Sequence, residues 1–216
     1  MAAHPALVID DVSKRFGAQW ALARLTYALP AGESLLLTGH NGSGKTTLLK
    51  LLSTSLSPTA GTLSVLGLHT VRDREPLRRS VALLSHANFL YEDLTARQNL
   101  TTFARLLGVG EAAERVSALL ERVGVAKRAD DPVRQFSAGM RKRVAVARLL
   151  LKAPRLALLD EPFGELDPPG IAQMEALIRE LQAAGTSLVL ATHLVEQGLS
   201  LCRNRLHLAH GRRAEP

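Results

Sequence analysis

The chain has 216 residues, of which 46% are hydrophobic and 22% are charged, a composition that excludes wholesale disorder and indicates a packed core. Its formal net charge of +7 suits anionic partners, yet aromatic residues make up only 4%, which disfavours a base-stacking surface for single-stranded nucleic acid. The sequence predicts no membrane span and no secretory signal, and its single cysteine, Cys202, excludes an internal disulfide and favours a reducing compartment.

The first part of the chain predicts short strands and one early helix. Apolar runs predict strands at residues 8–14, 23–28, 34–38 and 81–84. The run at 34–38 (SLLLT) leads directly into glycine-rich sequence, after which residues 46–52 predict a helix. Ser57, Pro58 and Gly61 are turn-forming residues that are expected to end this helix.

The middle of the chain predicts helices instead of strands. Thr95 and Gln98 stand three residues apart at the start of an apolar-periodic run, which is the spacing of a capping box, and Gly108 closes that run. A second helix, followed by Gly124, is predicted from four apolar residues on one helical face: Val116, Leu119, Leu120 and Val123.

The last third of the chain returns to alternating strands and helices. Strands are predicted at residues 156–159 and 187–191, with a helix at 171–184 between them that Gly185 stops. Alternation of this kind indicates a parallel sheet covered by helices on both faces, so we predict an α/β core with a helical insertion. Between Arg203 and Arg213 lie four arginines and no acid, and we expect this tail to be a solvated terminus.

A glycine-rich loop follows the strand at 34–38, and its residues 39–46 (GHNGSGKT) fit the pattern G-x-x-x-x-G-K-[ST] throughout. Glycines let the backbone wrap around phosphate oxygens with its N–H groups pointing inward, and the next helix directs the positive end of its dipole at them. Lys45 adds a charge at the β- and γ-phosphates, and Thr46 offers a hydroxyl to Mg²⁺. Nucleotide binding is therefore predicted for Gly39, Asn41, Gly42, Ser43, Gly44, Lys45, Thr46 and Thr47.

A second motif for phosphate chemistry is an apolar strand that ends in two acids. Residues 156–161 (LALLDE) place Asp160 and Glu161 at the end of a buried strand. Hydrolysis needs one carboxylate on the metal and another at the attacking water. We therefore assign Asp160 to Mg²⁺ and Glu161 to the polarisation of water.

Residues 136–148 (FSAGMRKRVAVAR) resemble the signature segment of the ATP-binding cassette ATPases, usually written LSGGQ, with its trailing basic helix. Ser137 and Gly139 are expected at the start of this helix, where a hydroxyl and free backbone N–H groups can hold a phosphate oxygen. In this family that phosphate belongs to ATP held by the opposing subunit. The resemblance therefore implies a second cassette as partner, forming a homodimer.

Further elements follow in the order of the same family. Residues 164–167 (GELD) resemble the D-loop, in which Asp167 reaches across the dimer interface, and residues 191–193 (ATH) resemble the switch segment, in which His193 contacts the γ-phosphate. Phe16 stands where the family places an aromatic ring on adenine. The resemblance implies ATP and Mg²⁺ as ligands, and it assigns catalysis to Lys45, His86, Glu161 and His193.

Two positions depart from the family pattern. The family usually has a glutamine near Mg²⁺ where this chain has His86, and neutral imidazole can approach a metal whereas imidazolium repels it. His86 is thus either a functional substitute for that glutamine or an ordinary loop residue. Met140 and Ala138 replace a glutamine and a glycine of the signature, which removes amide hydrogen bonds from this segment.

The resemblance implies a P-loop NTPase fold in the α/β class. Residues 1–86 and 138–216 are expected to form a RecA-like ATP-binding core, mainly a parallel sheet flanked by helices, with an antiparallel β portion near the amino terminus. Residues 87–137 are expected to form a helical subdomain that carries the signature segment at its end.

The function that the resemblance implies is ATP hydrolysis coupled to export, on the cytoplasmic side of the cell membrane. Ser-His at 85–86 and SAG at 137–139 are similar to the haem-exporter ATPase of bacterial cytochrome c biogenesis, with a small drug or lipid exporter as the alternative. A nucleic-acid-associated cassette protein is disfavoured, because tandem cassettes or long coiled-coil insertions do not fit within 216 residues. A membrane-spanning subunit is expected to dock near Phe89, Leu90 and Tyr91, for which an internal hydrophobic contact is the alternative.

Overall fold

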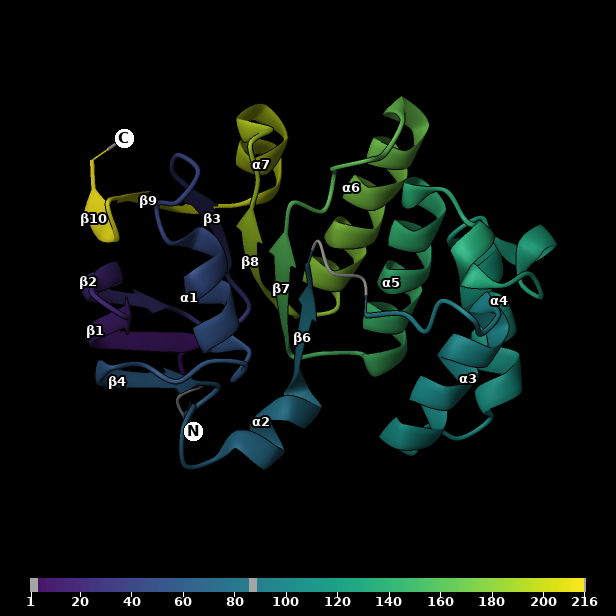
Figure 1. Cartoon of the computed structure of the whole chain (residues 1–216), viewed down its shortest axis with the longest axis horizontal. Helices are drawn as coiled ribbons and strands as arrows, with labels where there is room; N and C mark the ends of the chain where they lie inside the picture. The colour runs from purple at the N-terminus through teal and green to yellow at the C-terminus, as the bar shows by residue number, and fades with distance from the viewer. Residues whose placement is uncertain (1–3, 86–88, 216) are drawn as a thin grey trace.

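A six-stranded sheet runs through the centre of the structure, a computed structural model that describes residues 4–85 and 89–215 (Figure 1). The strand order is β10-β9-β3-β8-β7-β6, and neighbouring strands are parallel except for the antiparallel pair β10–β9. The strands are β3 (Ser34–Thr38), β6 (Val81–Leu84), β7 (Leu156–Asp160), β8 (Ser187–Ala191), β9 (Asn204–Ala209) and β10 (Arg212–Ala214).

A second sheet, antiparallel and in the order β2-β1-β4-β5, packs on one side of the first. Its strands are β1 (Leu7–Phe16), β2 (Gln19–Leu29), β4 (Ala60–Val65) and β5 (Leu68–His69). Helix α1 (Lys45–Leu52) lies between the two sheets in Figure 1, and its leucines share one core with Leu35 and Leu37 of β3. The antiparallel portion near the amino terminus is therefore present as predicted.

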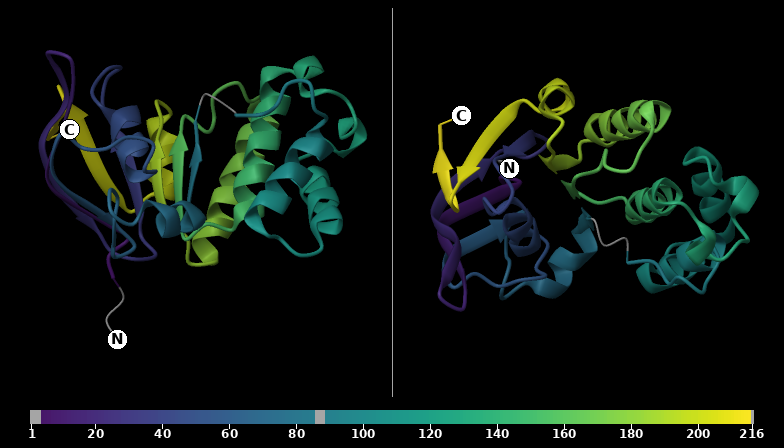
Figure 2. Two further views of the ribbon diagram at one scale, coloured as in Figure 1. Left: turned by 60° about the horizontal axis from the view of Figure 1, so that its bottom comes forward. Right: turned by 45° about the horizontal axis from the view of Figure 1, so that its top comes forward.

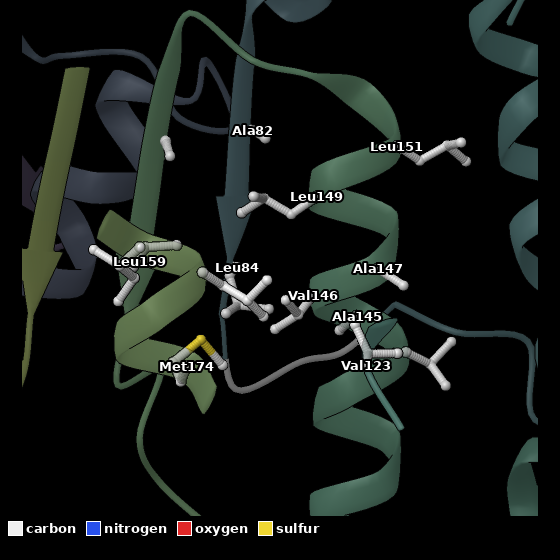
Figure 3. Close-up of a cluster of buried hydrophobic side chains, with 14 of the residues drawn as sticks. Ala82, Leu84, Val123, Ala145, Val146, Ala147, Leu149, Leu151, Leu159 and Met174 are labelled. Carbon is white, nitrogen blue, oxygen red and sulfur yellow. The ribbon is translucent and has the colours of Figure 1, made fainter. Parts of the chain in front are cut away.

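The opposite face of the parallel sheet is covered by helices α5 (Ala138–Lys152) and α6 (Pro168–Ala183). Side chains alternate between the faces of a strand, so Leu36 belongs to this second core while its neighbours Leu35 and Leu37 belong to the first. Figure 3 shows Leu84 and Leu159 of the sheet meeting Val146 of α5 and Met174 of α6. The two-sided cover explains why β3, β7 and β8 are buried along their whole length and are mainly apolar.

A group of helices lies beyond α5, at the far end of the molecule from the antiparallel sheet (Figure 2). It contains α3 (Ala96–Leu107), α4 (Ala112–Arg122) and short 3₁₀ turns at Ala126–Arg128 and Val133–Gln135. The predicted capping box of α3 is confirmed: Thr95 and Gln98 exchange side chain-to-backbone hydrogen bonds, and Gly108 ends the helix in a left-handed conformation. Two more short helices, α2 (Arg74–Ser80) and α7 (Val195–Leu201), were not predicted.

Two expectations about secondary structure are wrong. Gly61 is not only a turn residue, because it lies within strand β4, where its left-handed backbone sits against the carbonyl of Asp11. The tail after Arg203 is not a solvated terminus: β9 pairs with the central strand β3 and buries Leu206 and Leu208, while the arginine side chains face solvent. Among the described residues, the longest helices fall short of the length and apolarity that crossing a bilayer requires.

Candidate nucleotide-binding site

The candidate site lies at the carboxyl ends of β3, β7 and β8, where a pocket is lined by residues from three predicted motifs. Parallel strands bring their carboxyl ends to one edge of a sheet, which is where open α/β sheets bind ligands. The lining residues are Ala21, Asn41, Gly42, Gly44, Lys45, Thr46, Thr47, Asp160, Glu161 and His193. The motifs that are far apart in the sequence thus meet in one place.

The loop after β3 has a backbone that only glycine adopts readily. Gly39 has a φ of 143° and Gly44 a φ of 109°. A Cβ at Gly39 would collide with the carbonyl oxygen of Leu208 and lie 2.5 Å from Ser43 Oγ, so a side chain does not fit there. Gly44 directly precedes α1, which aims the positive end of its dipole at the pocket.

Lys45 is buried with its ammonium group inside this loop. Its Nζ donates hydrogen bonds to the carbonyl oxygens of Gly39, at 2.6 Å, and His40, at 3.1 Å. The buried hydroxyl of Ser43 has no hydrogen-bond partner within the described part of the chain. A phosphate group would supply acceptors for both the ammonium and the hydroxyl, which fits the predicted role of the loop.

Thr46 and Asp160 bring together two oxygen atoms suited to a hard cation. Thr46 Oγ1 donates to Asp160 Oδ2 at 2.8 Å, joining the first turn of α1 to the end of β7. Within residues 4–85 and 89–215 no cluster of three or more His, Cys, Asp or Glu side chains forms a metal cage. A single carboxylate and a hydroxyl fit Mg²⁺, which takes one or two protein oxygens and completes its shell with phosphate and water.

Glu161 follows β7 in a left-handed backbone conformation, with a φ of 49°. Its N–H donates to the carbonyl of Ala191 at 2.8 Å, and its Oε2 accepts the backbone N–H of His193 at 3.2 Å. Its Oε1 lies 3.5 Å from His193 Nε2 and is a buried atom that makes no hydrogen bond to any described residue. The carboxylate is therefore fixed through one oxygen, while the other remains able to accept a proton.

Six predicted binding residues do not line this pocket: Gly39 and Ser43 belong to the phosphate loop beside it, and Phe16, Ser137, Gly139 and Asp167 lie on other elements. Ser137 caps the amino terminus of α5 by accepting the N–H of Met140, with Gly139 in the first turn, and Asp167 caps α6 in the same way through Gly170. Phe16 is half-exposed at the end of β1. The fourth predicted catalytic residue, His86, lies outside the described residues.

Lys142 is a neighbour of the site that sequence reasoning missed. It is only 1% exposed, and its Nζ donates to the carbonyl oxygen of Glu161 at 3.0 Å. Burial lowers the pKa of Lys142, and the carboxylates of Glu165, Asp160 and Glu161 oppose that shift. A signal was present, because Lys142 shares the spacing of Ala145, Val146 and Leu149 and so lies on the buried face of α5.

Comparisons with known proteins agree on one family. A family model described as "ABC transporter" matches residues 22–164. The chain is 40% identical over 197 residues, 90% of its length, to "Daunorubicin resistance ATP-binding protein DrrA3" of Streptomyces coeruleorubidus. It is 34% identical over 211 residues, 97% of its length, to "Nod factor export ATP-binding protein I" of Ralstonia nicotianae. The chain spans 62% of the length of the first relative and 66% of the second.

Solved structures share the fold. One described as "Structure of ATP binding subunit of ABC transporter" superposes with a TM-score of 0.90 at 31% identity, covering 97% of this chain and 88% of that one. The ATP-binding cassette MJ0796, in a dimeric post-hydrolysis state bound to ADP and Pi, superposes with a TM-score of 0.89 at 24% identity, covering 97% of both chains. These likenesses confirm the predicted α/β P-loop NTPase fold.

Proposed function

Since the chain belongs to the ABC transporter family, we propose that it is the ATP-hydrolysing subunit of an exporter. The observation that carries this proposal is the convergence of Lys45, Asp160 and Glu161 in one pocket at the carboxyl ends of the parallel strands. Hydrolysis of a phosphoanhydride requires a cation that binds phosphate, a carboxylate that binds the metal and a second carboxylate with a free oxygen.

The phosphate loop and the metal-binding pair would hold the substrate. In this proposal Lys45 exchanges its two carbonyl partners for β- and γ-phosphate oxygens, and the buried hydroxyl of Ser43 donates to another. Thr46 and Asp160 would hold Mg²⁺, which when bound neutralises charge on the phosphate oxygens. Phe16, exposed at the end of β1, is proposed to stack on adenine.

Glu161 is proposed as the general base. Its free Oε1 accepts a proton from water as the oxygen attacks the γ-phosphorus, and ADP leaves with the bridging oxygen. His193 serves this step in two ways: its backbone N–H fixes the other carboxylate oxygen, and its imidazole lies beside the free one. In this arrangement the imidazole also reaches the γ-phosphate, which completes the polar lining of the pocket.

A second cassette is proposed as the partner that completes the site. Ser137, Gly139 and Asp167 lie away from the pocket of their own chain, yet Ser137 stands at the amino terminus of a 15-residue helix suited to an anion. In a head-to-tail pair, each α5 would supply this terminus to the nucleotide of the other copy. ATP would then hold the two copies together until hydrolysis.

A membrane-spanning subunit is proposed to dock on residues 89–91, and the chain is proposed to lie at the cytoplasmic face of the membrane. Phe89 is 63% exposed and Tyr91 is 56% exposed, whereas Leu90 packs against the core. Two exposed aromatic rings in one short segment favour a contact with another protein over an internal one.

Two candidates are proposed for the cargo. Haem is supported by the sequence features at residues 85–86 and 137–139, whereas the similarity to proteins named for daunorubicin resistance and Nod factor export favours a drug-like or lipid-like amphiphile. ATP turnover of the transporter reconstituted in vesicles tests both. We expect stimulation by haem, and stimulation by amphiphilic drugs but not by haem would overturn the first candidate.

The proposed mechanism is tested by Glu161→Gln and Ser137→Ala. Loss of the base should lower ATP turnover by about 100- to 1,000-fold and leave an ATP-bound dimer in gel filtration. Ser137→Ala should lower turnover while the isolated monomer keeps its ATP affinity, because the contact is made to the other copy. Wild-type turnover in Glu161→Gln would exclude Glu161 as the base, and weaker ATP binding by monomeric Ser137→Ala would exclude a role across the dimer.

A further inference from the structure

Lys142 occupies a place in α5 where an apolar side chain would be expected. Its neighbours on the same helical face are Ala145, Val146 and Leu149, all of which are buried. Burying an ammonium group costs free energy, and replacing a buried charge by an apolar side chain of similar size is often neutral or stabilising. A cation at this position therefore needs a reason other than the stability of the core.

The surroundings of Lys142 supply that reason, because they belong to the candidate site. Its Nζ donates to the backbone carbonyl of Glu161 at 3.0 Å, and the carboxylates of Glu165, Asp160 and Glu161 are the charges that favour its protonated form. Burial lowers the pKa of Lys142, and these three carboxylates oppose that shift. The cation and the acidic loop after β7 stabilise each other.

The hydrogen bond from Lys142 fixes a strained part of the backbone. Glu161 has a φ of 49°, a left-handed conformation that is unfavourable for a residue with a side chain. Its peptide N–H is held by the carbonyl of Ala191, and its carbonyl is held by Lys142. Because both sides of the residue are held, the direction of its carboxylate is held as well.

The same face of α5 touches the acidic loop at two more places. The backbone of Gly139 runs so close to Glu165 that a Cβ would lie 3.0 Å from its carbonyl oxygen. Arg143 Nη2 lies 3.5 Å from Asp167 Oδ1. Positions 139, 142 and 143 are spaced as one helical face, so a shift of the helix moves all three contacts together.

We propose that Lys142 is a positioning residue through which the signature helix controls Glu161 of its own chain. The inference rests on the proposed function, in which Ser137, five residues before Lys142, contacts the nucleotide of the other copy. When the start of α5 binds that nucleotide, a shift of the helix would move Lys142. Lys142 would in turn move Glu161 of its own chain, which is the base at the other ATP site of the dimer. The two ATP sites are thereby coupled through a single helix.

The test compares Lys142→Met with Lys142→Arg in the full chain. Methionine fills the space without a donor, and we expect turnover to fall by about 10- to 100-fold while the KM for ATP stays within about threefold. The variant should accumulate an ATP-bound dimer in gel filtration, as Glu161→Gln does. Arginine keeps the charge and the donor and should restore turnover to within about threefold of wild type.

Lys152 provides a matched control on the same helix. It also donates to a backbone carbonyl, that of Val81 at 2.6 Å, and burial also lowers its pKa, but carboxylates are not among the causes of its shift. We expect Lys152→Met to keep wild-type turnover. If Lys142→Met does not fold, Lys142→Gln, which is polar but one bond shorter, is measured against the same criteria.

The outcomes separate the inference from the proposed function. Three outcomes would overturn the inference and leave the proposed function standing. These are wild-type turnover in Lys142→Met, no accumulation of an ATP-bound dimer by Lys142→Met, and an equal turnover defect in Lys152→Met. A double variant Lys142→Met/Glu161→Gln should turn over no more slowly than Glu161→Gln, since both changes act on one step. A wild-type chain that does not hydrolyse ATP with its membrane partner would overturn the proposed function and the inference with it.

Discussion

Charged groups are buried at the carboxyl end of the parallel sheet, whereas in the helical region beyond α5 they lie on the surface. At the sheet end, Lys45, Lys142 and Asp160 are all buried. In the helical region, charged side chains pair on the surface, as Arg97 does with Asp130. That pair raises the pKa of Arg97 and lowers that of Asp130 through their mutual hydrogen bond, but water surrounds both groups.

The difference separates charged residues that take part in chemistry from charged residues that only pair on the surface. Surface ion pairs add little to folding because solvent screens them, and losing one changes little else. Buried charges are costly to fold around and persist where a ligand or a reaction needs them. Substitutions at the sheet end should therefore act on nucleotide binding and turnover, whereas substitutions in the helical region should act on stability alone.

The largest expected contrast is between two glycines with left-handed backbones, Gly39 at the sheet end and Gly108 in the helical region. In Gly39→Ala, the methyl group collides with the carbonyl of Leu208, a backbone atom that cannot swing away. We expect the phosphate loop to be displaced and ATP affinity to fall by at least about 100-fold, measured by calorimetry.

Gly108→Ala is the matched control, since a Cβ at Gly108 meets no atom within 4 Å. Only the strain of a φ of 68° remains, which costs about 1–2 kcal/mol of unfolding free energy and leaves ATP affinity unchanged. A Gly39→Ala protein that binds ATP as wild type does would show that the loop tolerates a side chain and that the contrast between the regions is false.

The sequence predicted the parts of both regions that are encoded locally. The phosphate loop, the strand ending in Asp160 and Glu161, and the capping box of α3 are contiguous patterns whose residue types are fixed by short-range geometry. The combination of Lys45, Asp160 and Glu161 in one pocket also followed, because parallel strands must bring their carboxyl ends together.

What could not be predicted depends on contacts between distant segments. The four arginines after residue 202 suggested a solvated tail. The segment instead pairs with β3 and buries Leu206 and Leu208 on alternate positions. Because the arginines point outward, their charge does not oppose this pairing.

Lys142 was missed although its spacing with Ala145, Val146 and Leu149 indicates the buried face of α5, because its contact with the loop after β7 is a long-range one. A basic run favours an exposed helix, and the packing of α5 on the loop after β7 gives the buried ammonium its acceptor.

Asn99 offers the next test, because it is the exception in the helical region: a fully buried polar side chain. Its Oδ1 accepts the N–H of Tyr91, and its Nδ2 donates to the carbonyls of Tyr91, Leu94 and Thr95. Asn99→Ala leaves the N–H of Tyr91 without this acceptor and removes one of the donors to each of the three carbonyls, which keep their backbone partners. We expect a loss of about 2–3 kcal/mol in unfolding free energy, measured by urea denaturation.

Thr95→Ala removes only the helix cap beside Asn99 and should lower the unfolding free energy by about 1 kcal/mol. It is the reference against which the larger loss in Asn99→Ala is measured. Neither change reaches the pocket, and ATP turnover of both folded variants should match wild type. A turnover defect confined to Asn99→Ala would break the comparison, because it would mean that the segment carrying Tyr91 acts on the nucleotide site. In that case the surface proposed for the membrane subunit and the site of hydrolysis would communicate through one buried amide.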